Sequence, residues 1–491
     1  MKHLKLVALL LLMIMGHQSF GKDGYHIHLK MPGVKDSLVF LAHYYGVNRP
    51  KIFKTDSARF KNGEADLKSN DPEFVGGIYI LFLSDYKTNF EVLMNKGDDM
   101  TITAPVNDLP DGLKFTNSPE NTRFEDYVKY LKSYGAKEEG FKKELAAAKT
   151  KDDTADIRKR AVASSKELNK FRRDYQAKYP GTLLAKIFKA IEVPEIPEGE
   201  HLLEDGKTKD STFNYRYYKK HFWDGFDFQD DRLIYTPLYD GKLEEYFSKL
   251  VLPWTDSLEK EADVLLKKAK GSKDVFHYTL WWITKYIEDS KVMGIDEAFV
   301  YLVENYYMKG DAFWLTNDEL SKFIDRAQKI APNVIGNLSP EVKLPNVTTK
   351  KEESMHGLKA KYTLLIFYSP TCGHCQHEMP KLDSAYKASL KAKGVKIFTV
   401  ATEGTDTAIN DFIKKYNMQE WTNTWDPGHT SDFHNKFDVY STPTIYLMDE
   451  KKIIKGKRLD HSNVGGLIDM IEKKIKADKE KEAKDKGSGA K

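Results

Sequence analysis

The feature that most constrains the fold is a near-continuous apolar run, 362–368, followed after a short loop by a Cys-Gly-His-Cys motif at 372–375 and by a segment with helical spacing, 375–390. This pattern predicts a buried strand that leads into a helix. The rest of the C-terminal part alternates strands and helices, which favours a βαβ unit with an added antiparallel hairpin. The further expected elements are 395–401, 408–416, 444–448, 453–457 and 464–475.

The length of 491 residues predicts a multidomain chain, because single domains cluster at roughly 100–150 residues. Apolar residues at 41% and charged residues at 31% are typical of folded protein. The expected parts are a signal peptide at 1–21, an antiparallel β-rich domain at 22–117, an α-helical domain at 118–335, an α/β domain at 336–476 and a charged disordered tail at 477–491.

The first segment has basic residues at Lys2 and Lys5, an apolar run at 6–15 and a polar end at Gly21. These three parts in this order are typical of a cleaved signal peptide. The apolar run is far shorter than the about 20 residues that span a bilayer, and no cysteine follows it that could carry a lipid. We expect an exported chain, in the periplasm or cell envelope, with no stable membrane anchor.

Period-two alternation separated by turn formers predicts the N-terminal strands, at 25–29, 37–41, 78–82, 90–94 and 100–103. The period then changes to that of a helix. Pro119 after Ser118 suits the first helical position, and Thr316 with Glu319 three residues later is a capping-box pattern.

The helical region is rich in aromatic residues, including Phe222, Trp223, Phe226, Phe228 and Trp282. Such residues could line a groove for peptide or glycan ligands. Packing between helices is the favoured interpretation, since buried aromatics dominate core energetics.

Lys and Arg number 77 against 73 Asp and Glu, a net charge of +4. A nucleic-acid partner is not expected, because it requires a concentrated basic face.

The chain has only two cysteines, Cys372 and Cys375, so disulfides do not staple its fold. Cys372 lies where a strand ends and a helix begins, and a helix N-terminus stabilises a thiolate. Cys372 is therefore the candidate nucleophile. Cys375, one helical turn further, is the candidate residue that resolves a mixed disulfide.

A zinc site, haem attachment and a structural disulfide are alternative uses of the two cysteines. A zinc site would require His374 and His377 as successive, crowded ligands, and haem attachment requires a histidine at 376, where Gln376 stands. A structural disulfide that closes so short a loop would restrain the unfolded chain little. We expect redox chemistry without a metal or cofactor.

With the motif at 372–375, Pro380 five residues later and Ser441-Thr442-Pro443-Thr444 further on, the region 340–476 resembles the thioredoxin superfamily, most of all its exported TlpA/ResA-like branch. The resemblance implies a thioredoxin fold, a cis peptide bond before Pro443 that faces the disulfide, and a Thr442 backbone that pairs with a bound substrate. The N-terminal domains resemble, more loosely, accessory modules of Bacteroidota proteins.

Two positions depart from the pattern of cytosolic thioredoxins. Ile366 stands where these proteins carry a buried Asp, so the proton for Cys375 must come from elsewhere. Glu403 is the nearest match to a Glu of the TlpA/ResA-like branch, and a solvated loop residue is the alternative. His374 stands between the cysteines, as in disulfide isomerases, and would add positive charge beside Cys372.

The first functional hypothesis is a reductase-like thiol-disulfide oxidoreductase that acts on disulfides of envelope proteins and is kept reduced by a membrane electron donor. An oxidase or isomerase is the alternative within the same chemistry. A binding or assembly protein with a secondary redox domain is another. A peroxidase is disfavoured by the positions of Pro370 and Thr371, which lie directly before Cys372 instead of seven and three residues ahead of it.

Overall fold

The computed structural model describes residues 23–488 except 36 and 46–50, so the predicted signal peptide lies outside the described residues. The chain forms two compact units. The first runs to Val251 and includes Val264–Leu280, and the second comprises Leu252–Asp263 and the chain from Trp281 onward. The predicted helical domain is thus shared between two units, and the predicted domain boundaries stay predictions. No helix of the described part is long and apolar enough to cross a membrane.

The first unit opens with two four-stranded sheets, with strand orders β4-β1-β7-β8 and β3-β2-β5-β6. Residues such as Ile27, Leu29 and Val39 alternate into a shared core and are fully buried. The strands are β1 Tyr25–Lys30, β2 Leu38–Tyr45, β3 Lys51–Arg59, β4 Glu64–Ser69, β5 Gly77–Leu83, β6 Asn89–Met94, β7 Asp98–Thr103 and β8 Lys114–Thr116; the 3-10 turn η1 is Val106–Asp108.

The pairing in this β-domain is antiparallel, as predicted, with one exception. β1 and β7 pair in parallel, with Ile27 opposite Met100. Strands β2 to β6 lie between them in the chain, and a connection of that length permits a parallel pair. The sequence patterns located β1, β2, β5, β6 and β7, whereas β3, β4 and β8 were missed.

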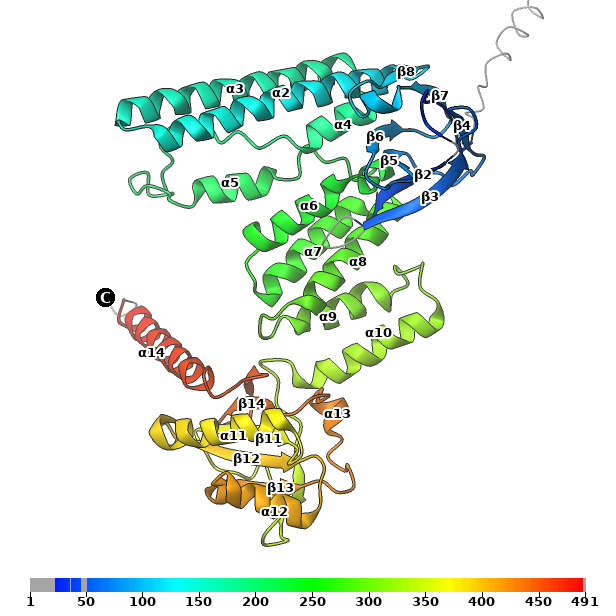
Figure 1. The fold of residues 1–491 in the computed structure, drawn as a ribbon. Coiled ribbons are helices and arrows are strands. Elements are labelled where there is room, and N and C mark those ends of the chain that lie inside the picture. Colours follow the sequence, from blue (N-terminus) through cyan, green and yellow to red (C-terminus); the bar gives the residue numbers. More distant parts are fainter. Residues whose placement is uncertain (1–22, 36, 46–50, 489–491) are drawn as a thin grey trace, which may run out of the picture. The chain divides into compact units, whose positions relative to one another are not determined.

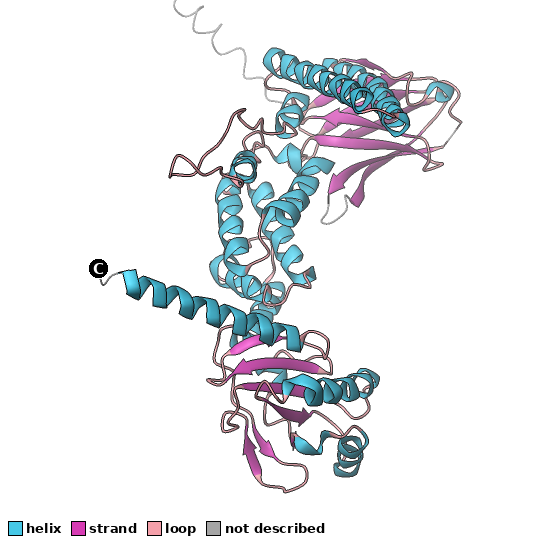
Figure 2. Cartoon of the chain, turned by 90° about the vertical axis from the view of Figure 1, so that its left-hand side faces the viewer, coloured by secondary structure: helices cyan, strands magenta, loops and turns pink. Residues whose placement is uncertain are grey.

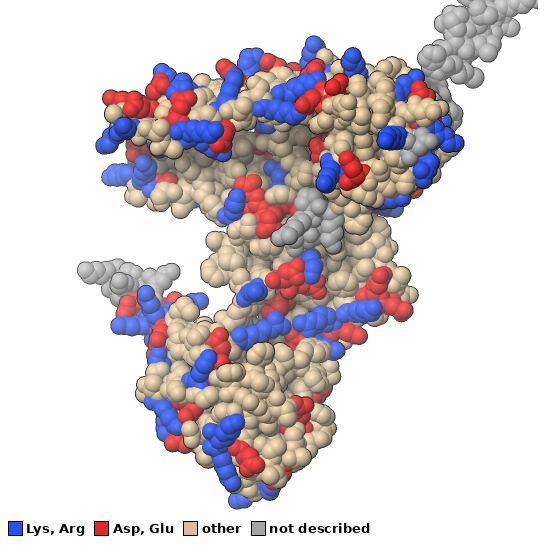
Figure 3. Space-filling model, in the orientation of Figure 1, with Lys and Arg blue, Asp and Glu red and all other residues tan. Residues whose placement is uncertain are grey.

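Helices follow from Pro119, the predicted first helical residue. The long helices α2 and α3 form a hairpin over which basic and acidic side chains alternate (Figure 3); Arg160, for example, pairs with Glu144 and Asp156. The elements are α2 Pro119–Ala147, α3 Lys151–Lys178, α4 Leu183–Ala190, α5 Phe213–His221, η2 Asp231–Tyr235, α6 Pro237–Glu245, η3 Tyr246–Leu250, α7 Thr255–Ala269, α8 Lys273–Asp289, α9 Asp296–Leu302, η4 Val303–Tyr307, α10 Asn317–Ile330 and η5 Ala331–Asn333.

The aromatic side chains of the first unit pack against one another, as favoured by the sequence. Phe222, Trp223, Phe226 and Phe228 are all buried. The rings of Trp223 and Phe226 meet edge to face with centroids 5.8 Å apart, an arrangement that adds to the gain from burial. These residues build a core, and Phe226 also borders a pocket beside Lys186 and Asp227.

The second unit contains a five-stranded sheet of order β13-β12-β11-β14-β15 (Figure 1). Strands β11, β12 and β13 are parallel, and β14 and β15 run antiparallel to β11 and to each other. The elements are β9 Lys343–Pro345, β10 Glu352–Ser354, β11 Tyr362–Tyr368, α11 Gly373–Ala385, η6 Tyr386–Leu390, β12 Val395–Ala401, α12 Asp406–Lys415, η7 Met418–Glu420, β13 Thr422–Trp425, α13 Phe433–Lys436, β14 Thr444–Asp449, β15 Ile454–Lys457 and α14 Val464–Ser488.

The central strand β11 is buried on both faces, as its unbroken apolar run requires. Leu364, Ile366 and Tyr368 point to the face that also carries Cys375 of α11. Leu365 and Phe367 point to the opposite face. One face of β11 therefore packs in the same apolar cluster as the start of α11.

A disordered tail was predicted at 477–491, whereas helix α14 continues to Ser488 (Figure 2). Lys, Glu and Ala dominate this stretch, and these residues favour a helix even without an apolar stripe. Residues 489–491 lie outside the described part.

The predicted capping box is confirmed at the start of α10: the Thr316 side chain accepts from the Glu319 N–H, and the Glu319 carboxylate accepts from the Thr316 N–H. Thr316→Ala should lower the free energy of unfolding by about 1 kcal/mol, because one helix N–H loses its acceptor. Thr316→Ser retains the hydroxyl and should unfold like the wild type. Denaturant unfolding monitored by circular dichroism checks this, and equal losses in both variants would contradict it.

Candidate active site

Cys372 occupies the N-cap position of α11, after a short loop from the end of β11. Its side chain is partly exposed, whereas Cys375, one turn into the helix, is fully buried. Both are free thiols in this structure. The strand-to-helix junction that the sequence predicted thus places one sulfur at the surface and the other in the core.

The surroundings of Cys372 favour its thiolate. Burial by itself raises the pKa of Cys372, but hydrogen bonds from the Thr442 side chain, from Cys375 and from the backbone N–H of His374 outweigh it, so the pKa lies below the usual value. Donors that point at the sulfur stabilise negative charge there. The lowered pKa increases the fraction of Cys372 that is a thiolate.

The surroundings of Cys375 have the opposite effect. Burial raises the pKa of Cys375 to about 12, although the backbone N–H of Ser369 and the Thr442 side chain donate to it. Met379 and Leu382, in the same apolar cluster, are fully buried. At neutral pH Cys375 is therefore a thiol.

The peptide bond between Thr442 and Pro443 is cis, as the resemblance implied. In the thiol state, the Sγ of Cys372 donates to the Thr442 carbonyl oxygen at 3.0 Å. The loop before β14 thus lies against the candidate nucleophile, although it is 70 residues away in the chain.

Glu403 does not reach Cys375 through any hydrogen bond that the described residues show. Its carboxylate accepts from the hydroxyls of Ser369 and Thr371, the latter at 2.9 Å. These hydrogen bonds hold the pKa of Glu403 below its usual range. Glu403 is ionised at neutral pH and ties the loop before Cys372 to the end of β12, so its contacts do not support the predicted role as a proton source.

The side chain of His374 is exposed, and its backbone N–H is the group that donates to Cys372. No group of His, Cys, Asp and Glu residues in the described part is arranged to hold a metal ion. The thiols themselves are the reactive groups that the site offers.

Sequence reasoning missed Tyr368, the last residue of β11, and Ser369 and Thr371 in the loop before the motif. Ser369 and Thr371 bind Glu403, a contact that no local pattern reveals. Tyr368 lies two residues after Ile366, on the same face of β11 as Cys375. A tyrosine at the end of a largely apolar strand was the sequence signal that could have indicated a polar group near the cysteines.

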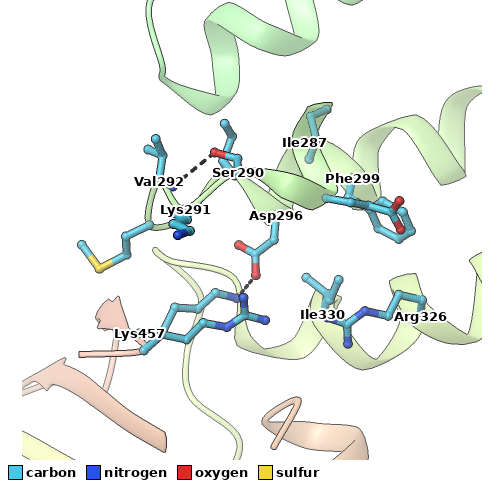
Figure 4. Close-up of a pocket in the computed structure, with 14 residues that line it drawn as sticks. Ile287, Ser290, Lys291, Val292, Asp296, Phe299, Arg326, Ile330 and Lys457 are labelled. Carbon is cyan, nitrogen blue, oxygen red and sulfur yellow. Dashed lines mark hydrogen bonds and ion pairs between the residues drawn. The ribbon is translucent and has the colours of Figure 1, made fainter. Parts of the chain in front are cut away.

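A cavity of about 410 Å³ lies elsewhere in the second unit, and none of the candidate site residues lines it. Lys457 and Asp296 point toward each other there, 2.6 Å apart (Figure 4). Lys457 also donates to the side-chain oxygen of Asn333 at 2.8 Å. Burial lowers the pKa of Lys457. This buried cation joins β15 to α9 and to the end of the helical region.

Three family matches cover most of the chain. Residues 25–124 match DUF4369 and residues 145–337 match DUF5106, both domains of unknown function. Residues 335–457 match the AhpC/TSA family. The two cysteines lie within the last of these segments.

Two relatives and one solved structure are similar to this chain. Thiol-disulfide oxidoreductase ResA of Oceanobacillus iheyensis is 30% identical over 87 residues, 17% of this chain and 45% of the relative. Thioredoxin-like protein YneN of Bacillus subtilis is 30% identical over 123 residues, 24% of this chain and 68% of the relative. A domain of a possible thiol-disulfide isomerase from Cytophaga hutchinsonii is 31% identical, with a TM-score of 0.28, over 30% of this chain and 99% of that one.

The chain belongs to the thioredoxin-like thiol-disulfide oxidoreductases, with the TlpA/ResA-like resemblance located in its C-terminal domain. It spans less than half of the length of the ResA protein from Oceanobacillus iheyensis.

The two thiols should differ sharply in reactivity. Brief alkylation of the reduced protein at neutral pH should label Cys372 and leave Cys375 unlabelled, because a thiolate is the reacting form. The labelling midpoint of Cys372 should lie below the ordinary thiol pKa of about 8.5, whereas Cys375 requires a pH near 12. Tandem mass spectrometry locates the label. Equal labelling of both cysteines would contradict this assignment.

Proposed function

We propose that the protein reduces disulfide bonds in exported proteins through Cys372 and Cys375. The observation that supports thiol-disulfide exchange by this pair is the divergence of the two thiol pKa values, lowered for Cys372 and raised to about 12 for Cys375. A pair of titratable groups with opposite shifts marks a division of chemical roles.

The reaction proceeds by thiol-disulfide exchange. The Cys372 thiolate attacks one sulfur of the substrate disulfide, a mixed disulfide forms, and the first substrate thiolate leaves. Cys375 then loses its proton and attacks the Cys372 sulfur, which releases the second thiolate. The substrate gains two electrons, and the protein is left with a Cys372–Cys375 disulfide.

The apolar surroundings of the pair support the reductase direction. Ile366 and Cys375 are fully buried, and an apolar environment favours a neutral disulfide over a thiolate. The hydrogen bonds to Cys372 act the other way, since a stabilised thiolate makes a couple more oxidising. The reduction potential of the Cys372–Cys375 pair depends on the balance between its apolar surroundings and the hydrogen bonds to Cys372.

The reductase cycle requires a donor that restores the two thiols, and we assign this role to an electron donor in the membrane. Substrates in the envelope fit the signal-peptide pattern at 1–21. The Thr442 carbonyl beside Cys372 offers a backbone acceptor for an extended substrate segment.

The substrate should be captured covalently when the second step is blocked. Cys375→Ser leaves Cys372 able to attack, so the mixed disulfide should persist and be identified by mass spectrometry under non-reducing conditions. Cys372→Ser is the matched control, because it retains the buried thiol but lacks the nucleophile. Equal capture by both variants would exclude the assigned order of attack.

The direction of electron flow is measured by equilibrium with glutathione buffers. The reductase hypothesis predicts a potential more negative than the glutathione poise of about −220 to −260 mV. A value at or above that range would instead establish the oxidase or isomerase alternative. The fraction of oxidised protein at each buffer ratio, read after rapid alkylation, gives the potential.

A further inference from the structure

The second step of the exchange presents a problem that the two cysteines do not solve. Cys375 must attack as a thiolate, yet burial raises its pKa to about 12. Ile366, which belongs to the same apolar cluster, carries no polar group. Some group must stabilise the negative charge while Cys375 attacks, because an unpaired charge in the core is very unfavourable.

Tyr368 is positioned to supply such a group. It follows Ile366 by two residues on β11, so both side chains point to the same face of the sheet. Tyr368 is fully buried in the cluster that contains Cys375. Its ring stacks on Phe412 of α12, with centroids 5.1 Å apart, which fixes the plane of the phenol.

The Tyr368 hydroxyl is unusual because, among the described residues, it has no hydrogen-bond partner. A buried hydroxyl without a partner is destabilising, and such a group in a folded protein calls for an explanation. Burial raises the pKa of Tyr368, and the charge of the Cys375 thiolate raises it further. The phenol therefore stays protonated and remains a donor whenever Cys375 ionises.

We propose that the Tyr368 hydroxyl is the hydrogen-bond donor that stabilises the Cys375 thiolate during the resolving step, directly or through one bridging water. This inference rests on the proposed function. The proton of Cys375 passes to the departing substrate thiolate or to solvent, and Tyr368 keeps its own. The Cys375 thiolate then forms the bond to the Cys372 sulfur as the bond from that sulfur to the substrate breaks.

Glu403 is the competing candidate, since its predicted role was to serve Cys375. Its carboxylate accepts from Ser369 and Thr371, and its pKa is lowered. A carboxylate that is ionised and occupied by two donors is a poor donor to a thiolate. The Tyr368 hydroxyl has no other hydrogen-bond partner among the described residues, and its side chain is fully buried, so it can donate to a thiolate in the core.

The test uses the full-length reduced protein and an equimolar aromatic disulfide that releases a coloured thiolate in each step. The first release reports attack by Cys372, and the second reports resolution by Cys375. Tyr368→Phe removes only the hydroxyl and keeps the ring on Phe412. It should leave the first phase unchanged and slow the second about tenfold, the effect of one hydrogen bond to a charged group, with the pH profile of the second phase moved upward.

Tyr446→Phe is the matched control. Tyr446 is buried on the opposite face of the same sheet, and its hydroxyl donates to the Phe437 carbonyl oxygen. This variant loses a buried hydroxyl that does have a partner, so it should lose stability without altering the pH profile of the second phase.

Each outcome decides one question. A second phase in Tyr368→Phe with wild-type rate and pH profile overturns the role of Tyr368, as does an equal shift in Tyr446→Phe. Slowing in Glu403→Gln alone would assign the role to Glu403. Absence of the first phase in the wild type, or its persistence in Cys372→Ser, would instead overturn the proposed function.

Discussion

The proposed exchange chemistry depends on one constraint, that the sulfur atoms of Cys372 and Cys375 lie close enough to bond while their surroundings differ in polarity. The turn from β11 into α11 meets both requirements, because two helical residues, Gly373 and His374, separate the N-cap Cys372 from the buried Cys375. Cys372 receives donors at the helix start, whereas Cys375 faces the core. β11, the loop after it and α11 together hold the segment from Cys372 to Cys375 in this position.

The sequence predicted the central strands of the C-terminal sheet well because they are largely continuous apolar runs, whereas the polar edge strand β13 was not predicted. β11 and β12 have the predicted bounds, 362–368 and 395–401. β3 was missed because its residues show no regular alternation of apolar and polar side chains. β4 does alternate, with Ala65 and Leu67 buried between charged residues, so its signal was present but was overlooked. The parallel pairing of β1 with β7 was not predictable either, because it depends on how distant strands meet.

The candidate site was predictable to the extent that its chemistry lies in a local motif. Cys372, Cys375 and Pro443 could be named from their spacing and from the family resemblance. The contacts of Glu403 could not, because Ser369 and Thr371 meet it only after β11 and β12 pair side by side. Tyr368 was overlooked because a tyrosine within an apolar strand looks like a packing residue, and only its unpartnered hydroxyl in the fold distinguishes it.

The buried ammonium of Lys457 has a consequence for how the redox sheet can be isolated. Its partners, Asp296 and Asn333, both precede residue 336 in the chain. A truncated protein that began at 336 would keep the cation in β15 and discard both acceptors. The ammonium would then have to replace both acceptors with water. A truncated protein that is meant to keep this ion pair must therefore include Asp296 and Asn333.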